Sequence, residues 1–112
     1  PKNKSKYKEM FRNAVALIFV VDASDSARFE EAKTEFHRIY NEISISKNTV
    51  LVFANKQDIE GAASERDMKS YLNLYSIRAS TWNIYASSFT RGDGLEASLM
   101  WLECETGKNI RD

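Results

Sequence analysis

The sequence has 112 residues, of which 43% are apolar, and sixteen basic residues balance sixteen acidic ones. This composition is ordinary for one compact domain and excludes a largely disordered chain, while the zero net charge excludes a global field that would draw it to nucleic acid. The single Cys104 cannot form an internal disulfide, so we expect a reducing, cytoplasmic setting. No apolar run approaches the roughly 20 residues needed to span a bilayer.

The first predicted elements are a short helix and a buried strand. Ser5 to Arg12 is expected to be helical, and the basic run Pro1 to Lys8 is interpreted as its solvated face rather than as a patch for anionic lipid or nucleic acid. Val15 to Val21 is continuously apolar and rich in β-branched residues, which is typical of a parallel strand buried on both faces. Asp22 and Asp25 follow, and we expect a turn and a helix cap there rather than a metal or acid/base pair.

A long amphipathic helix and a second strand come next. Asp25 to Ile43 carries apolar residues at helical spacing, with Asp25 or Ser26 as the expected cap. Thr49 to Ala54 is a second continuous apolar run and is predicted to be a buried parallel strand. The helix residues expected to face inward are Phe29, Ala32, Phe36, Ile39, Tyr40 and Ile43.

The remaining elements complete an alternating order of helices and strands. A helix is predicted after Ser64, whose spacing to Asp67 resembles a capping box, and its expected inward residues are Met68, Tyr71 and Leu72. Trp82 to Ala86 favours a third strand, and a last helix runs from about Leu95 to a C-cap near Gly107. This order predicts a single α/β domain over residues 1–112, with a three-layer parallel sheet and right-handed crossovers.

The strongest chemical signal is Asn55-Lys56-Gln57-Asp58, directly after the second strand. Ligands of open parallel sheets bind beyond the carboxyl ends of strands. There the Asp58 carboxylate can accept hydrogen bonds from N1–H and the exocyclic amine of guanine, whereas adenine would leave it unpaired. Asn55 would hold neighbouring loops, and the stem of Lys56 would cover one face of the base while its ammonium stays in water. The alternative interpretation is a polar turn that merely closes the strand.

Several blocks of the sequence, in order and spacing, resemble the ADP-ribosylation factor and Arf-like group of small GTPases. The blocks are Leu17-Ile-Phe-Val-Val-Asp22-Ala-Ser-Asp25, Glu31-Ala-Lys-Thr-Glu-Phe36, Leu51-Val-Phe-Ala-Asn-Lys-Gln-Asp58 and Gly92-Asp-Gly-Leu95 followed by Trp101-Leu102. The resemblance covers roughly Tyr7 to Leu102. It implies the carboxyl-terminal half of a P-loop small GTPase fold that binds GTP and GDP.

The resemblance also implies a guanine pocket built from two loops, with the residues Asn55, Lys56, Asp58, Ser88, Phe89 and Thr90. In the family, a small residue, often alanine, stands where this chain has Phe89, and its backbone amide donates to the guanine carbonyl oxygen. The bulky ring of Phe89 is therefore a departure that would narrow the pocket. Simple turn chemistry is the alternative interpretation of Ser88 and Thr90.

The phosphate-binding parts of the family pattern do not occur in this sequence. It contains no G-x-x-x-x-G-K-[ST] loop to cradle phosphates and hold Mg²⁺, and no D-x-G-G segment. On the family pattern Pro1 falls just after that segment, so the sequence looks like a portion cut in the second switch. We therefore expect no catalytic or metal-binding residue in this portion, with hydrolysis and Mg²⁺ binding requiring the missing amino-terminal half.

Partners are predicted from the family and from the first strand. The family's sheet places its own first strand beside Val15 to Val21, and a bare apolar edge invites aggregation, so we expect the missing half or a second copy to pair there. The family further implies exchange and activating factors, effectors, and a switch in vesicle trafficking at Golgi or other endomembranes. The rival interpretation, from another class, is a nucleotide-free protein-interaction module, that is, a degenerate GTPase domain.

Overall fold

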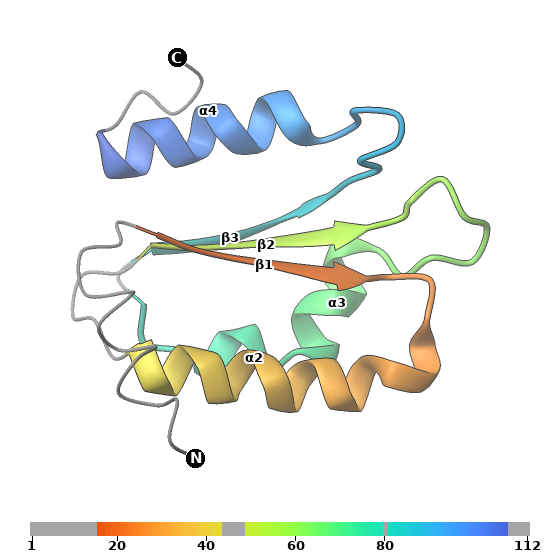
Figure 1. Ribbon diagram of the computed structural model, residues 1–112, viewed down its shortest axis with the longest axis horizontal. Coiled ribbons are helices and arrows are strands. Elements are labelled where there is room, and N and C mark those ends of the chain that lie inside the picture. The colour runs from red at the N-terminus through yellow and green to blue at the C-terminus, as the bar shows by residue number, and fades with distance from the viewer. Residues whose placement is uncertain (1–15, 44–48, 80, 108–112) are drawn as a thin grey trace.

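The computed structural model describes residues 16–43, 49–79 and 81–107, and Figure 1 shows its three layers. The strands β1 (Ala16–Asp22), β2 (Thr49–Asn55) and β3 (Thr81–Ala86) form a parallel sheet in the order β1-β2-β3. Helices α2 (Phe29–Ile43) and α3 (Glu65–Tyr71) lie on one face, and α4 (Leu95–Thr106) lies on the other (Figure 1). The predicted α/β class and three-layer parallel sheet are therefore confirmed.

The predicted strands agree with the observed ones to within a residue at each end. The central strand β2 is buried along its whole length up to Asn55 because it supplies alternate side chains to both layers. Val50 and Val52 join the core beneath α2 and α3, whereas Leu51 and Phe53 join Leu102 of α4 on the opposite face. The predicted opening helix, Ser5 to Arg12, lies outside the described residues.

Helix α2 begins at Phe29, later than predicted, after a 3-10 turn at Ser26–Arg28. The expected cap is wrong, because Asp25 makes no side-chain capping hydrogen bond. Its carboxylate instead pairs with the Arg28 guanidinium at 3.4 Å. The inward face is confirmed for Phe29 and Phe36, which are buried, and Phe36 meets Phe19 of β1 edge to face at 5.2 Å between ring centres. Three further predicted residues pack partly buried against this core: Ala32, Ile39 and Tyr40.

Helix α3 confirms its predicted cap and corrects one of its predicted core residues. The Asp67 N–H donates to the Ser64 hydroxyl at 3.2 Å, and Met68 and Leu72 are fully buried. Tyr71 was expected to face inward but is 49% exposed. In so short a helix only one stripe reaches the sheet, and the Tyr71 ring lies at the surface against Phe29, with the ring centres 4.8 Å apart. Helix α4 ends at Gly107 in a left-handed conformation, as predicted.

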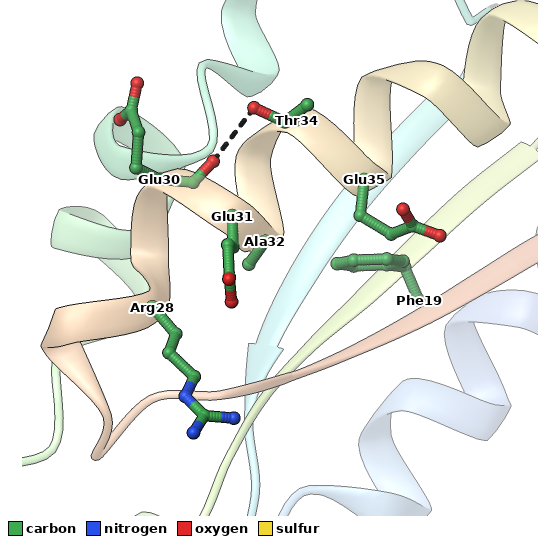
Figure 2. A pocket seen from close by; sticks show the side chains of 7 residues that line it. All are labelled: Phe19, Arg28, Glu30, Glu31, Ala32, Thr34 and Glu35. Carbon is green, nitrogen blue, oxygen red and sulfur yellow. Dashed lines mark hydrogen bonds between the residues drawn. The ribbon is translucent and has the colours of Figure 1, made fainter.

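Strand β1 is not buried on both faces, which corrects the prediction made from its continuous apolar sequence. Leu17 and Val21 face the core beneath α2, but Ile18 and Val20, on the opposite face, are 49% and 48% exposed. The physical reason is that α4 lies over β2 and leaves β1 open. On the α2 side, a groove of about 740 Å³ lies between Phe19 of β1 and the first turns of α2, and its lining also includes Arg28, Glu31 and Glu35 (Figure 2). An edge strand that is open in this way offers unsatisfied backbone and apolar surface together.

Candidate nucleotide-binding site

A recess of about 240 Å³ opens among the loops that follow β2 and β3. Six residues line it: Asn55, Lys56, Asp58, Ile59, Phe89 and Thr90. Ser88 is fully buried next to the recess, and its hydroxyl donates to Asp58 Oδ1 at 2.8 Å. The structure therefore brings together all the site residues that the sequence indicated, and adds Ile59.

Asn55 ties the two loops to each other. Its Oδ1 accepts hydrogen bonds from the Ser87 hydroxyl at 3.1 Å and from the Phe89 backbone N–H at 3.0 Å. A third bond, from the Gln57 N–H to the Ser87 carbonyl at 3.0 Å, joins the loops again. This geometry agrees with the expected holding role of Asn55. It also means that the Phe89 amide, expected to face a guanine carbonyl oxygen, already donates to Asn55 in this structure.

Asp58 is an exposed carboxylate held in a fixed direction. The hydrogen bond from the Ser88 hydroxyl is the largest influence that lowers the pKa of Asp58, and Arg91 and Lys56 add weaker attraction. The group is therefore ionised at neutral pH and acts only as an acceptor. An ionised acceptor at the wall of a recess is the group that the N–H donors on one edge of guanine require.

Lys56 leaves β2 in a strained backbone conformation and reaches toward β1. Its φ of 69° lies in the left-handed region, which costs a residue with a side chain on the order of 1 kcal/mol. Its Nζ pairs with Asp22 Oδ2 at 3.0 Å, so the ammonium is not simply in water as expected. Strain of this kind persists where the surroundings fix it, and here the Ile59 N–H donates to the Lys56 carbonyl at 3.0 Å and the Gln57 N–H to the Ser87 carbonyl at 3.0 Å.

Asp22 forms the predicted turn and has a second partner that the sequence analysis missed. Its Oδ1 accepts from the Ser24 N–H at 2.9 Å and from the Ser24 hydroxyl at 2.6 Å. The Ser24 hydroxyl is the largest cause of the lowered pKa of Asp22, and the Lys56 ammonium lowers the pKa further. The pairing with Lys56 follows from register, because Asp22 stands opposite Asn55 in the β1-β2 ladder. Only the alignment of the two strand ends could have revealed it.

Two further residues position the loops without lining the recess. The Gln57 side-chain amide donates to the Ala54 carbonyl at 3.1 Å and to the Ala63 carbonyl at 2.8 Å, which closes the loop after β2. Gly94, with φ of 82°, precedes α4 at a point where a Cβ atom would collide with the Ala86 carbonyl oxygen. This role of Gln57 could not be predicted from the motif alone, although a glutamine side-chain amide inside a tight loop can donate to backbone carbonyls.

Other candidate chemistry finds no support within residues 16–43, 49–79 and 81–107. No group of three or more His, Cys, Asp or Glu residues there could hold a metal ion. His37 Nε2 lies 2.7 Å from the Leu72 carbonyl oxygen and thereby joins α2 to the end of α3. None of the described helices has the length and apolar character needed to cross a membrane.

A parallel α/β sheet with an Asn-Lys-x-Asp loop at its carboxyl edge, tied to a second loop beside a recess of about 240 Å³, is the architecture of part of a P-loop GTPase fold. The sequence pattern of the ADP-ribosylation factor family matches residues 2–106. The chain therefore belongs to the ADP-ribosylation factor family, as its blocks of sequence indicated. Because the members of this family are small GTPases that bind GTP and GDP, guanine-nucleotide binding is assigned to the chain at the level of the family.

Proposed function

We propose that the recess among the loops after β2 and β3 holds the guanine base of GTP or GDP, in a switch protein of membrane traffic. The observation that carries this proposal is the ionised Asp58 carboxylate, which lines a recess of about 240 Å³ and is oriented by the buried Ser88 hydroxyl. Family membership supports the wider role, with exchange factors, activating factors and effectors as partners at Golgi or other endomembranes.

Selectivity for guanine would come from the carboxylate of Asp58. Guanine offers two N–H donors to it, whereas adenine presents an acceptor that would face a negative charge and leave it unpaired. Sites built on such hydrogen bonds reject the unmatched analogue by factors of about 10⁴ when they are buried, and by less at an exposed site such as this one. Lys56, held by Asp22, and the loop of Thr90 would enclose the base.

We propose that phosphate binding and hydrolysis require an amino-terminal half of the kind that a complete small GTPase domain carries. Phosphoryl transfer depends on backbone amides, a lysine and Mg²⁺ around the phosphates. The sequence contains no G-x-x-x-x-G-K-[ST] loop to supply them together, and the residues around the recess are proposed to hold the base end of the nucleotide. Mg²⁺, when bound with the phosphates, would supply charge neutralisation there.

Titration with nucleosides tests the base site without any phosphate contact. We expect the chain to bind guanosine in preference to adenosine, and Asp58→Asn to abolish that preference because the amide offers a donor where guanine also has a donor. Glu60→Gln is the matched control, since it neutralises an exposed carboxylate of the same loop that does not line the recess. Equal affinity of the unaltered chain for both nucleosides would refute the proposal.

We further propose that the open edge of β1 pairs with another polypeptide strand, which is the first strand of the amino-terminal half. The half-exposed Ile18 and Val20 on one face, and the groove beside Phe19 on the other, support this (Figure 2). A strand added at this edge would pair with the outer backbone groups of β1 and cover the apolar side chains of Ile18, Phe19 and Val20. Self-pairing with a second copy is the competing occupant.

Light scattering and hydrogen exchange distinguish pairing with the amino-terminal half from pairing with a second copy. If the amino-terminal half is supplied as a separate polypeptide, we expect a one-to-one complex and slowed exchange of the outer amides of β1. Val20→Lys should weaken that complex, whereas Met100→Lys, an equally exposed position on α4, should not. Dimers that persist in the presence of the other half would favour self-pairing. A monodisperse monomer with freely exchanging outer amides in that mixture would contradict both.

The second candidate function, a nucleotide-free interaction module, is favoured by one observation. The Phe89 amide already donates to Asn55, and the Phe89 ring occupies part of the recess lining. On this interpretation the same folded loops would serve as a protein-binding surface. Absence of any guanosine binding by the unaltered chain joined to its amino-terminal half would support it over the base site.

A further inference from the structure

Phe89 is the largest side chain in the lining of the recess, and 41% of it is exposed. Ile59, from the other loop, also lines the recess and is 43% exposed. The other four lining residues are polar or charged. Ligand sites typically combine a few directional polar groups with apolar and aromatic walls, and the recess has this composition on a small scale.

The position of the Phe89 ring is fixed before any ligand arrives. Its ring meets that of Phe53 in a T-shaped contact, with the ring centres 5.0 Å apart and the planes at 78°. Phe53 is itself 5% exposed and belongs to the core beneath α4. The Phe89 backbone is held as well, through the hydrogen bond from its N–H to Asn55 at 3.0 Å. A wall that is already ordered loses little conformational entropy when a ligand packs against it.

We propose that the Phe89 ring is the aromatic wall against which the flat face of the base packs. This inference rests on the proposed function, since it names the part of that site which holds the base face. The contact adds affinity for any purine, because every base has a π-face. It does not discriminate between bases, because discrimination requires hydrogen bonds to the base edge. Phe89 and Asp58 therefore have separate roles, one for affinity and one for preference.

The hydrogen bonding of Phe89 supports this division. In the described structure its amide donates to Asn55, which leaves the half-exposed ring as the part of this residue that can meet a ligand in the recess. The charged lining residues, Lys56 and Asp58, belong to the loop after β2, where Lys56 forms an ion pair with Asp22 of β1. Phe89 enters from the loop after β3, so that the recess receives its charged and its aromatic components from different strands.

Guanosine and inosine form a suitable pair of probes, because they differ only in the exocyclic amine that Asp58 would bind. We expect Phe89→Ala to lower the affinity for both nucleosides by the same factor, about five- to tenfold for a partly exposed ring. Phe89→Tyr should keep the affinity of the unaltered chain, and Phe89→Leu should resemble Phe89→Ala. Met100→Ala, which removes an equally accessible apolar side chain on α4, serves as the control. Asp58→Asn should change the guanosine-to-inosine ratio, which the Phe89 variants leave unchanged.

An NMR measurement distinguishes a wall that touches the base from a residue that only supports the fold. The H8 proton of guanosine should move upfield on binding to the unaltered chain and to Phe89→Tyr, but much less on binding to Phe89→Leu. Unchanged affinity of Phe89→Ala and Phe89→Leu, with no upfield shift in the unaltered chain, would overturn this inference while the base site stands. If the unaltered chain binds no guanosine, the proposed function and this inference fall together.

Discussion

The two edge strands of the sheet, β1 and β3, differ in how far the chain itself satisfies and covers them. On β3, two of the amides that point away from β2 find acceptors within the chain. The Ala86 N–H donates to Glu65 Oε2 at 2.7 Å and the Ile84 N–H to Asn83 Oδ1 at 2.8 Å. On β1, the side chains of Ile18 and Val20 are half exposed and a groove runs alongside. Side chains of the chain itself satisfy part of the β3 edge, as is common where a sheet ends, whereas within the described residues the β1 edge keeps two half-exposed apolar side chains.

Of the substitutions that test the difference between the two edges, Phe36→Ala is expected to have the largest effect on stability. Phe36 is fully buried and packs against Phe19, so it fastens β1 to α2. Removing the ring should lower the free energy of unfolding by about 3–5 kcal/mol. We expect amides of β1 to exchange faster than those of β3 in this variant, as measured by hydrogen exchange with mass spectrometry. Phe36→Leu keeps most of the apolar volume and should lose much less of the free energy of unfolding. Equal acceleration of amide exchange in β1 and β3 would show that the two edges do not unfold independently.

A smaller effect is expected from opening the closed edge with Glu65→Ala. The Ala86 N–H then loses its acceptor, which costs about 1 kcal/mol at a partly exposed position. Glu65→Gln retains an acceptor oxygen and should recover most of this loss. Urea unfolding gives the stabilities, and the exchange rate of the Ala86 amide reports the edge directly. Equal stability of the two variants would mean that water replaces the carboxylate without cost.

The smallest effect is expected from acid, which acts on the loops after the edge strand β1 and the central strand β2. The Ser24 hydroxyl lowers the pKa of Asp22 and the Ser88 hydroxyl lowers the pKa of Asp58, in both cases from an ordinary value of 3.8. Because the folded pKa values lie below the unfolded value, the stabilisation is present above that value and is lost as the pH falls through the folded ones. Carbon-detected NMR titration should show that Ser88→Ala raises the pKa of Asp58 and leaves that of Asp22 unchanged. A shift of both would indicate coupling through Lys56.

The strands and most of the helix faces could be predicted because they depend on local pattern. A continuous apolar run such as Thr49 to Ala54 followed by a polar loop is enough to indicate a buried parallel strand and a ligand edge. The same rule was wrong for the exposure of Ile18 and Val20, because burial depends on what covers a strand and not on its own sequence. Tyr71 was misplaced for a similar reason, since a short helix presents only one stripe to the sheet.

The members of the candidate site could be predicted, but their connections could not. Asn55, Lys56 and Asp58 were found because a short motif carries them at fixed spacing. The ion pair between Lys56 and Asp22 and the bond from the Phe89 amide to Asn55 join residues far apart in the sequence. Such contacts depend on strand register and on the path of two loops. The cap expected from Asp25 failed because the 3-10 turn Ser26–Arg28 comes first and α2 begins only at Phe29.

Gly94 does not line the recess, but its conformation affects the position of residues that do. A methyl group at this position would press on the Ala86 carbonyl oxygen and push the first turn of α4 outward. That helix covers Phe53, and Phe53 supports the Phe89 ring. A substitution at Gly94 changes no lining residue, but through α4 and Phe53 it would shift the Phe89 ring and thereby weaken nucleotide binding.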